Sequence, residues 1–395
     1  MDMQTTADEI DLHWPARFNE VPKEVFHRED VFQLEQERIF KGPEWHPLAH
    51  QAELPNPGDF KTGFIGTAPV LIVHGDDGRI RVFENSCTHR ATTLQTASRG
   101  NAQRIQCPYH RWTFNTRGDL LGVPGVTDFP PEFRQEDYAL RQLRSAQVFG
   151  LIFATYSSAV AELEEYLGDV LPFIARILGG DGRLKLLGYQ KVIFNCNWKL
   201  YNDNEGYHGP LLHAAFRILQ LQAGKGEQFM TGNAHKANWT ELPPARDTGF
   251  LSDFSVIEAR DPKVVAANTI VSLFPLGQMT KNLDVINVRH AHALSASETE
   301  VHYAYFAHQD DSDEVVRHRI RQASNLIGPS GFVSLEDGAV FSRIQQGSHS
   351  RGNLGFQKGV KANMTAPCTL GPGEEAGNLI RWERYRQIMG FDRES

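Results

Sequence analysis

Two short Cys/His pairs between residues 84 and 124 constrain this chain more than any other feature of its sequence. Cys87 and His89 form a C-x-H pair, and after seventeen intervening residues Cys107 and His110 form a C-x-x-H pair. Two short turns that meet at the end of a β-sheet can bring these four side chains together. Two thiols and two imidazoles then make a Cys2His2 metal site, which suits either zinc or an iron–sulfur cluster.

The order of the ligands favours the cluster. Zinc fingers pair Cys with Cys and His with His, whereas each turn here supplies one of each. In a Rieske [2Fe-2S] centre the two Cys hold one iron and the two His hold the other. A structural zinc protein remains the alternative, and colour separates the two, because a zinc protein is colourless and a Rieske protein is red-brown.

This stretch resembles the Rieske-type non-haem iron oxygenases, specifically the large (α) subunits of aromatic-ring hydroxylases. It is similar to the family's C-x-H-R-G and C-x-Y-H-G-W-x-F motifs, and the resemblance covers roughly residues 24 to 347. Two positions depart from the motifs, since Ala91 and Arg111 stand where the family usually has Gly. All four ligand positions are retained.

A second group of metal-competent residues lies between residues 195 and 222. His208 and His213 are spaced H-x4-H, and Glu205 precedes the first of them by three residues. On a regular helix the two His would point about 140° apart. Convergence on one metal therefore requires a distorted turn, for which Gly209-Pro210 is well suited.

A pair of His at this spacing becomes a metal site only with a third ligand. Two His and one carboxylate form the facial triad of non-haem Fe(II) oxygenases, with positions left open. The resemblance implies that Asp337 is this carboxylate, since an acidic pair followed by Gln eight or nine residues later is similar to the family's pattern. Glu336 is the competing ligand, and both acids can instead charge the first turn of a helix.

The resemblance also implies a role for Glu205. In the family an acidic residue three before the first metal His bridges the Rieske His of one subunit and an iron-ligand His of the next. The family usually has Asp there, and the segment from N-W-K to Y-H is about two residues shorter here. The alternative for Glu205 is a solvated helix charge.

Hydrophobic periodicity predicts an α+β chain in three parts. Residues 1–44 are expected to form a helical leader that packs on the catalytic domain, with an amphipathic helix within residues 24–40. Residues 45–156 are predicted to form short strands, with both ligand turns on hairpins and a further D-G hairpin at Asp77-Gly78. The resemblance implies that this part is an N-terminal all-β Rieske domain. Residues 157–395 alternate strands and helices, and the resemblance implies a C-terminal helix-grip catalytic domain, an antiparallel sheet covered by helices.

Composition narrows the class of protein. A net charge of −8 argues against a nucleic-acid partner, and there is neither a signal sequence nor an apolar run of membrane length. We therefore expect a cytoplasmic protein. Cys196 and Cys368 are expected to be ordinary free thiols. His290, His292, His302 and His308 follow the strand alternation of residues 269 to 308 and are expected to lie on strand faces rather than bind metal.

Two unlike metal sites imply a division of labour. A Rieske cluster passes single electrons and has no vacant position, while the mononuclear Fe(II) keeps positions open for O2 and substrate. No flavin or nicotinamide fingerprint is present, so electrons from NADH or NADPH must arrive through a separate reductase, with or without a ferredoxin. The resemblance implies a homotrimer of α subunits, or an α3β3 assembly with a small β subunit.

The sequence is least informative about the substrate. Four residues can line a pocket near the iron, and such a pocket suits an aromatic molecule. The same four residues can instead belong to the ordinary core: Asn202, Phe216, Leu219 and Gln222. We expect the protein to hydroxylate an aromatic compound by adding two hydroxyl groups to the ring. Oxidative O- or N-demethylation by a Rieske monooxygenase is the alternative within the class, and an electron carrier without oxygenase activity is the alternative outside it.

Overall fold

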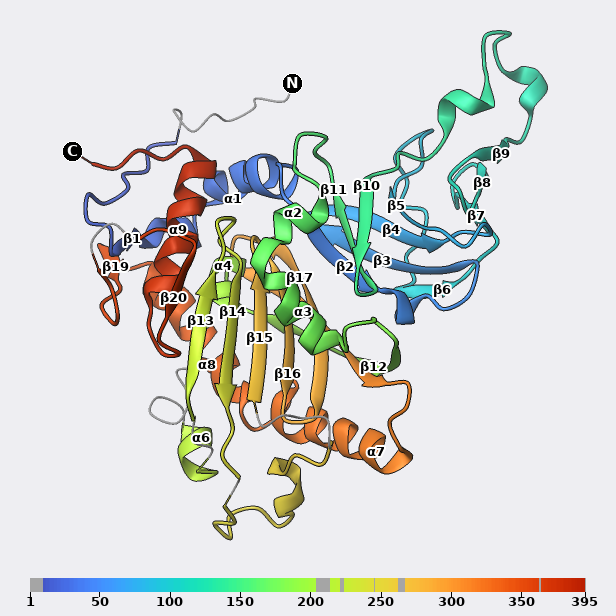
Figure 1. Ribbon diagram of the computed structural model, residues 1–395. Coiled ribbons are helices and arrows are strands. Elements are labelled where there is room, and N and C mark those ends of the chain that lie inside the picture. The colour runs from blue at the N-terminus through green and yellow to red at the C-terminus, as the bar shows by residue number, and fades with distance from the viewer. Residues whose placement is uncertain are drawn as a thin grey trace. The chain divides into compact units, whose positions relative to one another are not determined.

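The computed structural model describes residues 10–203, 214–220, 224–244, 246–261, 267–361 and 364–394. The chain forms two compact units, one of residues Lys41–Leu163 and one that joins Met1–Phe40 to Glu164–Ser395. Each unit contains its own antiparallel sheets (Figure 1). None of the described helices has the length and hydropathy of a membrane-spanning segment.

The unit of residues 41–163 consists almost entirely of short strands. Its three sheets have the orders β10-β11-β2, β5-β4-β3-β6 and β7-β8-β9. The strands are β2 His46–His50, β3 Asp59–Ile65, β4 Ala68–His74, β5 Ile80–Glu84, β6 Arg99–Asn101, β7 Arg104–Gln106, β8 Thr113–Asn115, β9 Leu120–Gly122, β10 Arg144–Val148 and β11 Leu151–Thr155. The predicted D-G hairpin is confirmed, because Asp77-Gly78 connects the paired strands β4 and β5 and Gly78 has a φ of 75°.

The prediction that both ligand turns lie on hairpins is correct only for the second turn. Cys107 and His110 connect β7 and β8, which pair with each other. Cys87 and His89 follow β5, but the next strand, β6, lies at the opposite edge of that sheet. The first turn therefore begins a crossover, and the residues that follow it must traverse the sheet before they can pair.

The other unit is built on one eight-stranded sheet, in the order β12-β18-β17-β16-β15-β14-β13-β20. Its strands are β12 Leu184–Phe194, β13 Gly226–Met230, β14 Lys236–Glu241, β15 Ala267–Leu273, β16 Gly277–Asn282, β17 Val285–Ser295, β18 Glu298–His308 and β20 Cys368–Leu370. The small pair β1 Glu20–Pro22 and β19 Asn353–Gly355 lies outside it. The longest strands of the sheet are β12, β17 and β18, with eleven residues each, and β18 pairs with both of the others.

Helices cover both faces of this sheet, so the expected α+β architecture is confirmed. In Figure 1, α3 lies in front of the strands and α8 lies behind them. The helices are α1 Glu29–Glu35, α2 Leu163–Leu167, α3 Leu171–Leu178, α4 Trp198–Asp203, α6 Ala214–Ile218, α7 Asp313–Gln322, α8 Ser334–Ser348 and α9 Ala376–Met389. The amphipathic helix expected within residues 24–40 is shorter than its pattern, because α1 ends at Glu35 and passes into a π-turn, Gln36–Phe40.

Strand register determines which side chains face α8. Residues directly opposite each other on antiparallel strands share a face, and alternate residues point to opposite faces. Arg289 on β17 is opposite Tyr303 on β18, and His290 is opposite His302. Nη1 of Arg289 and the hydroxyl of Tyr201 on α4 both lie within 3.5 Å of Oε1 of Gln278. The Tyr201 ring lies 5.9 Å from that of Phe341 on α8, so the Arg289 and Tyr303 side chains lie on the face that α4 and α8 cover.

Candidate metal centres

The two Cys/His turns have the same backbone hydrogen bonds. In each turn the N–H of residue i donates to the carbonyl of residue i+5, and the N–H of residue i+4 donates back to the carbonyl of residue i, where i is Cys87 or Cys107. The four distances lie between 2.8 and 3.1 Å. Two loops of equal shape therefore present two pairs of ligands, although the sequences between the ligands differ in length.

The departures from Gly noted in the sequence fall at the left-handed position of each loop. Ala91 has a φ of 55° and Arg111 has a φ of 61°. An L-residue in this conformation costs roughly 1–2 kcal/mol relative to the right-handed region. Both loops retain the backbone that Gly would adopt freely, and Arg111 donates a hydrogen bond of 2.9 Å to the side chain of Gln106.

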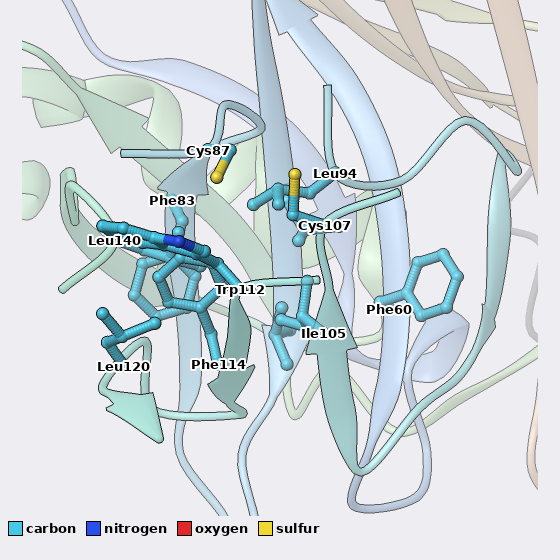
Figure 2. Close-up of a cluster of buried hydrophobic side chains, with 12 residues drawn as sticks. Phe60, Phe83, Cys87, Leu94, Ile105, Cys107, Trp112, Phe114, Leu120 and Leu140 are labelled. Atoms are coloured by element: carbon cyan, nitrogen blue, oxygen red, sulfur yellow. The ribbon is translucent and has the colours of Figure 1, made fainter. Parts of the chain in front are cut away.

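The two thiols lie beside each other at one end of a buried apolar cluster (Figure 2). Cys87 is 3% exposed and Cys107 is 2% exposed. Burial raises the pKa of the Cys87 thiol, and the neighbouring Cys107 adds to the shift. No disulfide joins them, since all four cysteines are free. Beneath them lie Phe83, Ile105, Trp112, Phe114 and Leu120.

The two imidazoles of the turns also meet. The ring centroids of His89 and His110 are 4.8 Å apart, and His89 stacks on Trp112 at 4.6 Å with an interplanar angle of 2°. Nδ1 of His110 is buried and has no hydrogen-bond partner among the described residues. A buried, unsatisfied ring nitrogen is expected of a metal ligand without its metal. The four side chains therefore fit a metal group.

The spacing of these side chains fits two metal ions better than one. In the described part of the chain, one trio of His, Cys, Asp or Glu has ligand atoms that all lie within 4.8 Å of one another, namely His292, Glu300 and His302. No three of the four Cys/His ligands meet that limit. A tetrahedral zinc would hold all its donors within about 4 Å of each other. A binuclear cluster is wider, so the arrangement favours it over zinc.

The trio itself lies on the face of the sheet opposite to Arg289. Glu300 already shares its carboxylate, since Nζ of Lys191 and Nε2 of His302 each lie 2.5 Å from one of its oxygens. An ammonium group in direct contact would repel a cation. We therefore assign no metal to the trio.

The N-W-K sequence positions the segment that carries the expected iron ligands. Asn197 caps α4, because its Oδ1 accepts a hydrogen bond of 3.0 Å from the N–H of Lys199. Trp198 and Lys199 both donate to the buried carboxylate of Glu35 in α1, at 2.7 and 2.5 Å. Burial lowers the pKa of Lys199, and Glu35 opposes that shift. The start of α4 is thus fixed by a charged contact with the N-terminal segment.

Of the expected iron ligands, the structure describes only Asp337. His208 and His213 lie outside the described residues, as do Glu205 and Gln222. Asp337 is in the first turn of α8, with its Oδ1 buried. The competing Glu336 accepts a hydrogen bond of 3.0 Å from the backbone N–H of Ala214, the residue that follows His213. Glu336 therefore contacts the beginning of α6, and Asp337 follows it in the first turn of α8.

The three described residues of the expected substrate pocket have different surroundings. Asn202 donates to the carbonyl of Pro275 at 2.8 Å and lines a cavity with Trp198 and Trp382, beside α9. Phe216 is partly buried on α6, and Leu219 is 1% exposed just after it. Arg289 and Tyr303 could not be singled out from the sequence, because the face on which they lie depends on the register of β17 and β18.

Comparisons with known proteins agree with this geometry. Residues 44–140 match the model of the Rieske [2Fe-2S] domain, and residues 181–376 match that of the ring hydroxylating alpha subunit (catalytic domain). The large subunit of anthranilate 1,2-dioxygenase from Burkholderia cepacia is 32% identical over 97% of both chains. The alpha 2 subunit of the terminal oxygenase component of terephthalate 1,2-dioxygenase from a Comamonas species is 31% identical, over 96% of this chain and 98% of that one.

Solved structures lead to the same group. A crystal structure of naphthalene 1,2-dioxygenase from Rhodococcus, bound to indole, superposes with a TM-score of 0.81 at 25% identity and covers 94% of both chains. The chain belongs to the Rieske-type ring-hydroxylating oxygenase alpha subunits, which combine a Rieske [2Fe-2S] domain with a catalytic domain of the mononuclear-iron type.

Proposed function

We propose that this chain is a terminal oxygenase in which Cys87, His89, Cys107 and His110 hold the [2Fe-2S] cluster. His208, His213 and Asp337 hold the mononuclear iron. The observation that carries the iron assignment is the division between the two neighbouring acids of α8. Glu336 accepts a hydrogen bond from the backbone immediately after His213, so the first turn of α8, which also carries Asp337, is held beside the ligand segment.

The two metal groups supply different chemistry when bound: the cluster transfers single electrons, and the iron activates O2. The protein's own residues keep each group in a suitable setting. The apolar cluster around Cys87 and Cys107 excludes water from the sulfur side of the cluster site. The stacked rings of His89 and Trp112 fix the imidazole plane.

The reaction that we propose is hydroxylation of an aromatic ring, with both oxygen atoms of O2 added as a dihydroxylation. Anthranilate and terephthalate, named in two relatives, are aromatic acids, whereas naphthalene is a hydrocarbon. These names agree on an aromatic ring and differ on whether it bears a charged group. Oxidative demethylation needs only a different pose of the substrate at the same iron, and it remains the alternative.

Electrons are proposed to come from NADH or NADPH through a separate reductase, with or without a ferredoxin. Glu205 is proposed to bridge the Rieske His of one subunit and an iron-ligand His of the next in an α3 or α3β3 assembly, and so to connect the path for electron transfer between subunits. Light scattering on the purified protein measures that assembly directly, and a monomer would contradict an inter-subunit bridge. The Glu205→Gln variant should then slow electron transfer to the mononuclear iron while leaving the cluster spectrum unchanged.

A single-turnover experiment tests the proposed function. The protein is reduced chemically, freed of excess reductant and mixed with ¹⁸O2 and one of benzoate, anthranilate, salicylate, naphthalene or 4-methoxybenzoate. We expect cluster oxidation together with a hydroxylated product that contains ¹⁸O. Formaldehyde from 4-methoxybenzoate would favour demethylation. Oxidation of the cluster without product from any compound would identify an electron carrier instead.

A further inference from the structure

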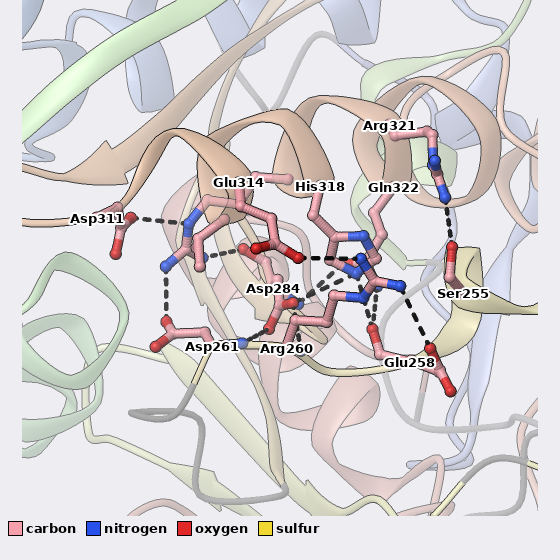
Figure 3. A network of polar contacts seen from close by, with 12 residues as sticks. Ser255, Glu258, Arg260, Asp261, Asp284, Asp311, Glu314, His318, Arg321 and Gln322 are labelled. Carbon is pink, nitrogen blue, oxygen red and sulfur yellow. Dashed lines mark hydrogen bonds and ion pairs between the residues drawn. The ribbon is translucent and has the colours of Figure 1, made fainter.

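Two arginines lie inside the catalytic unit with very different surroundings. Arg319 on α7 is 1% exposed and is paired with two carboxylates, Asp261 at 2.6 Å and Asp311 at 2.9 Å. It also donates to the backbone carbonyl of Asp284. Figure 3 shows this network with Asp261, Asp284 and Asp311 labelled. The positive charge of Arg319 is thus neutralised within the protein, as a buried charge requires.

Arg289 on β17 has only neutral groups around its charge. Its Nε donates to Oδ1 of Asn287 at 3.1 Å, and its Nη1 donates to Oε1 of Gln278 at 2.6 Å. The guanidinium carbon lies 4.8 Å from the centre of the Tyr303 ring. No carboxylate lies within ion-pair distance of Arg289 in the described part of the chain. A guanidinium does not lose its proton in a protein, so this charge is permanent.

The position of Arg289 connects it to the proposed iron. The ring of Tyr201 on α4 lies 5.9 Å from that of Phe341, which is on α8 one turn after Asp337. The hydroxyl of Tyr201 on α4 lies 3.5 Å from Oε1 of Gln278, the same oxygen that accepts from Arg289. The charge therefore lies between α4, which leads to the expected His ligands, and α8, which carries the expected carboxylate ligand.

We propose that Arg289 binds the carboxylate of the substrate, which is therefore an aromatic acid. This inference rests on the proposed function, because it assumes that a substrate ring lies on this face of the sheet. A guanidinium donates two parallel N–H groups to a planar carboxylate, a geometry that fixes orientation as well as charge. Gln278 and Asn287 hold the guanidinium from the protein side, and the anion completes its neutralisation.

The surrounding side chains suit an aromatic ring attached to that carboxylate. Tyr201 packs against Phe194 and Phe341, with ring centroids 5.7 and 5.9 Å apart. These buried rings make the surroundings of a single charge apolar, the usual composition of a site for a small aromatic acid. A neutral hydrocarbon in the same place would leave Arg289 without a counter-charge and would bind less well.

Matched acids and amides test the proposal on the assembled wild-type oxygenase. Binding is measured by equilibrium dialysis, and hydroxylation by kcat/KM, for benzoate, anthranilate and salicylate against benzamide, 2-aminobenzamide and salicylamide. We expect at least one acid to be favoured over its amide by about a hundredfold, as is typical for a desolvated charge pair. Equal values for every acid and its amide would overturn the proposal.

The Arg289→Met variant removes the charge and keeps much of the side-chain length. We expect kcat/KM for the favoured acid to fall about a hundredfold, while that for the amide changes less than about threefold. Arg289→Lys, which keeps the charge without the planar fork, should fall between the two. Arg176→Met, on the exposed surface of α3, is the control for loss of one positive charge and should change neither value.

The outcomes separate the two proposals. Arg289-dependent binding of an acid without any hydroxylation would sustain the carboxylate site and contradict the proposed function. Hydroxylation in which Arg289→Met keeps the full preference for the acid would sustain the proposed function and contradict the carboxylate site. If the Met variant does not fold, as judged by loss of the far-UV circular dichroism of the catalytic unit, the acid-to-amide ratio of the wild type and of Arg289→Lys decides the matter.

Discussion

The cluster turns and the catalytic region both fit iron, but they are assembled over very different lengths of chain. The four proposed cluster ligands lie between Cys87 and His110, on two loops with the same local hydrogen bonds. The catalytic region depends on contacts between distant segments. Asn197 is bonded to Gln345, 148 residues away, and Lys199 to Glu35, 164 residues away.

This difference predicts how each site responds to substitutions. Local hydrogen bonds form the cluster loops, so a change elsewhere in the chain should leave their shape intact. The start of α4 is held by charged and polar contacts that reach across the unit, so loss of one distant side chain should disturb it. Variants in the two regions can therefore test whether the cluster loops depend on local contacts and the catalytic region on distant ones.

Loss of a cluster thiol should have the largest effect. Cys107→Ala removes one of two ligands to an iron, so we expect complete loss of the red-brown absorbance and of turnover. Iron and acid-labile sulfide analysis measures this directly. Cys368→Ala is the matched control, because Cys368 lies on β20 in the other unit and should keep both cluster and turnover. A Cys107→Ala protein with a normal cluster would remove Cys107 from the ligand set.

Loss of the Glu35 carboxylate should have the next largest effect. Glu35→Gln leaves the Lys199 ammonium buried without its counter-charge, and we expect the free energy of unfolding to fall by about 3–5 kcal/mol. Urea unfolding at pH 7 measures the loss. Glu24→Gln, at an exposed position in the same segment, is the control and should change stability by less than about 0.5 kcal/mol.

The same variant should depend on pH in a defined direction. Burial lowers the pKa of Lys199 in the folded protein, and removal of Glu35 lowers it further. Between that lowered pKa and the unfolded value of about 10.4, the unfolded chain binds the extra proton, so stability rises with pH. The deficit of Glu35→Gln should therefore shrink from pH 7 to pH 9. A constant deficit would show that the lost hydrogen bonds, rather than the buried charge, are responsible.

Relief of the backbone strain at Ala91, which has a left-handed conformation, should have the smallest effect. Ala91→Gly removes the strain of a φ of 55°, but Gly also loses more conformational entropy on folding. We expect a gain of at most about 1 kcal/mol, seen as a small rise in the melting temperature of the holoprotein. Ala97→Gly in the same connection, where φ is not positive, should instead lose about 0.5–1 kcal/mol. Equal losses in both variants would contradict the strain argument.

The sequence predicted most where the relevant contacts are local. The cluster ligands and the hairpin at Asp77-Gly78 depend on spacings of a few residues, and the structure has the hairpin. The first ligand turn was placed wrongly on a hairpin, because the pairing of β6 with β3 rather than β5 is a long-range choice.

Arg289 and Tyr303 could not be predicted, because their surroundings depend on long-range contacts. Arg289 is one polar residue in an alternating strand, and only the pairing with Tyr303 and the hydrogen bond to Gln278, which Tyr201 also approaches, reveal what it faces. A lone arginine on the buried face of a strand was the available signal, but the face itself cannot be assigned before the register is known. Likewise, the hydrogen bond from Ala214 to Glu336, which supports our proposal of Asp337 as the ligand, could not be read from the sequence.

The most direct test of the two-site account is metal and sulfide content, with an EPR spectrum, on anaerobically purified wild type, Asp337→Ala and Glu336→Gln. The account predicts three irons and two sulfides in wild type, since a binuclear cluster and one mononuclear iron are expected. Asp337→Ala should keep the Rieske spectrum and lose the mononuclear iron together with O2-dependent turnover. Glu336→Gln still accepts the Ala214 hydrogen bond and should keep all three irons. Full iron and turnover in Asp337→Ala would contradict the account.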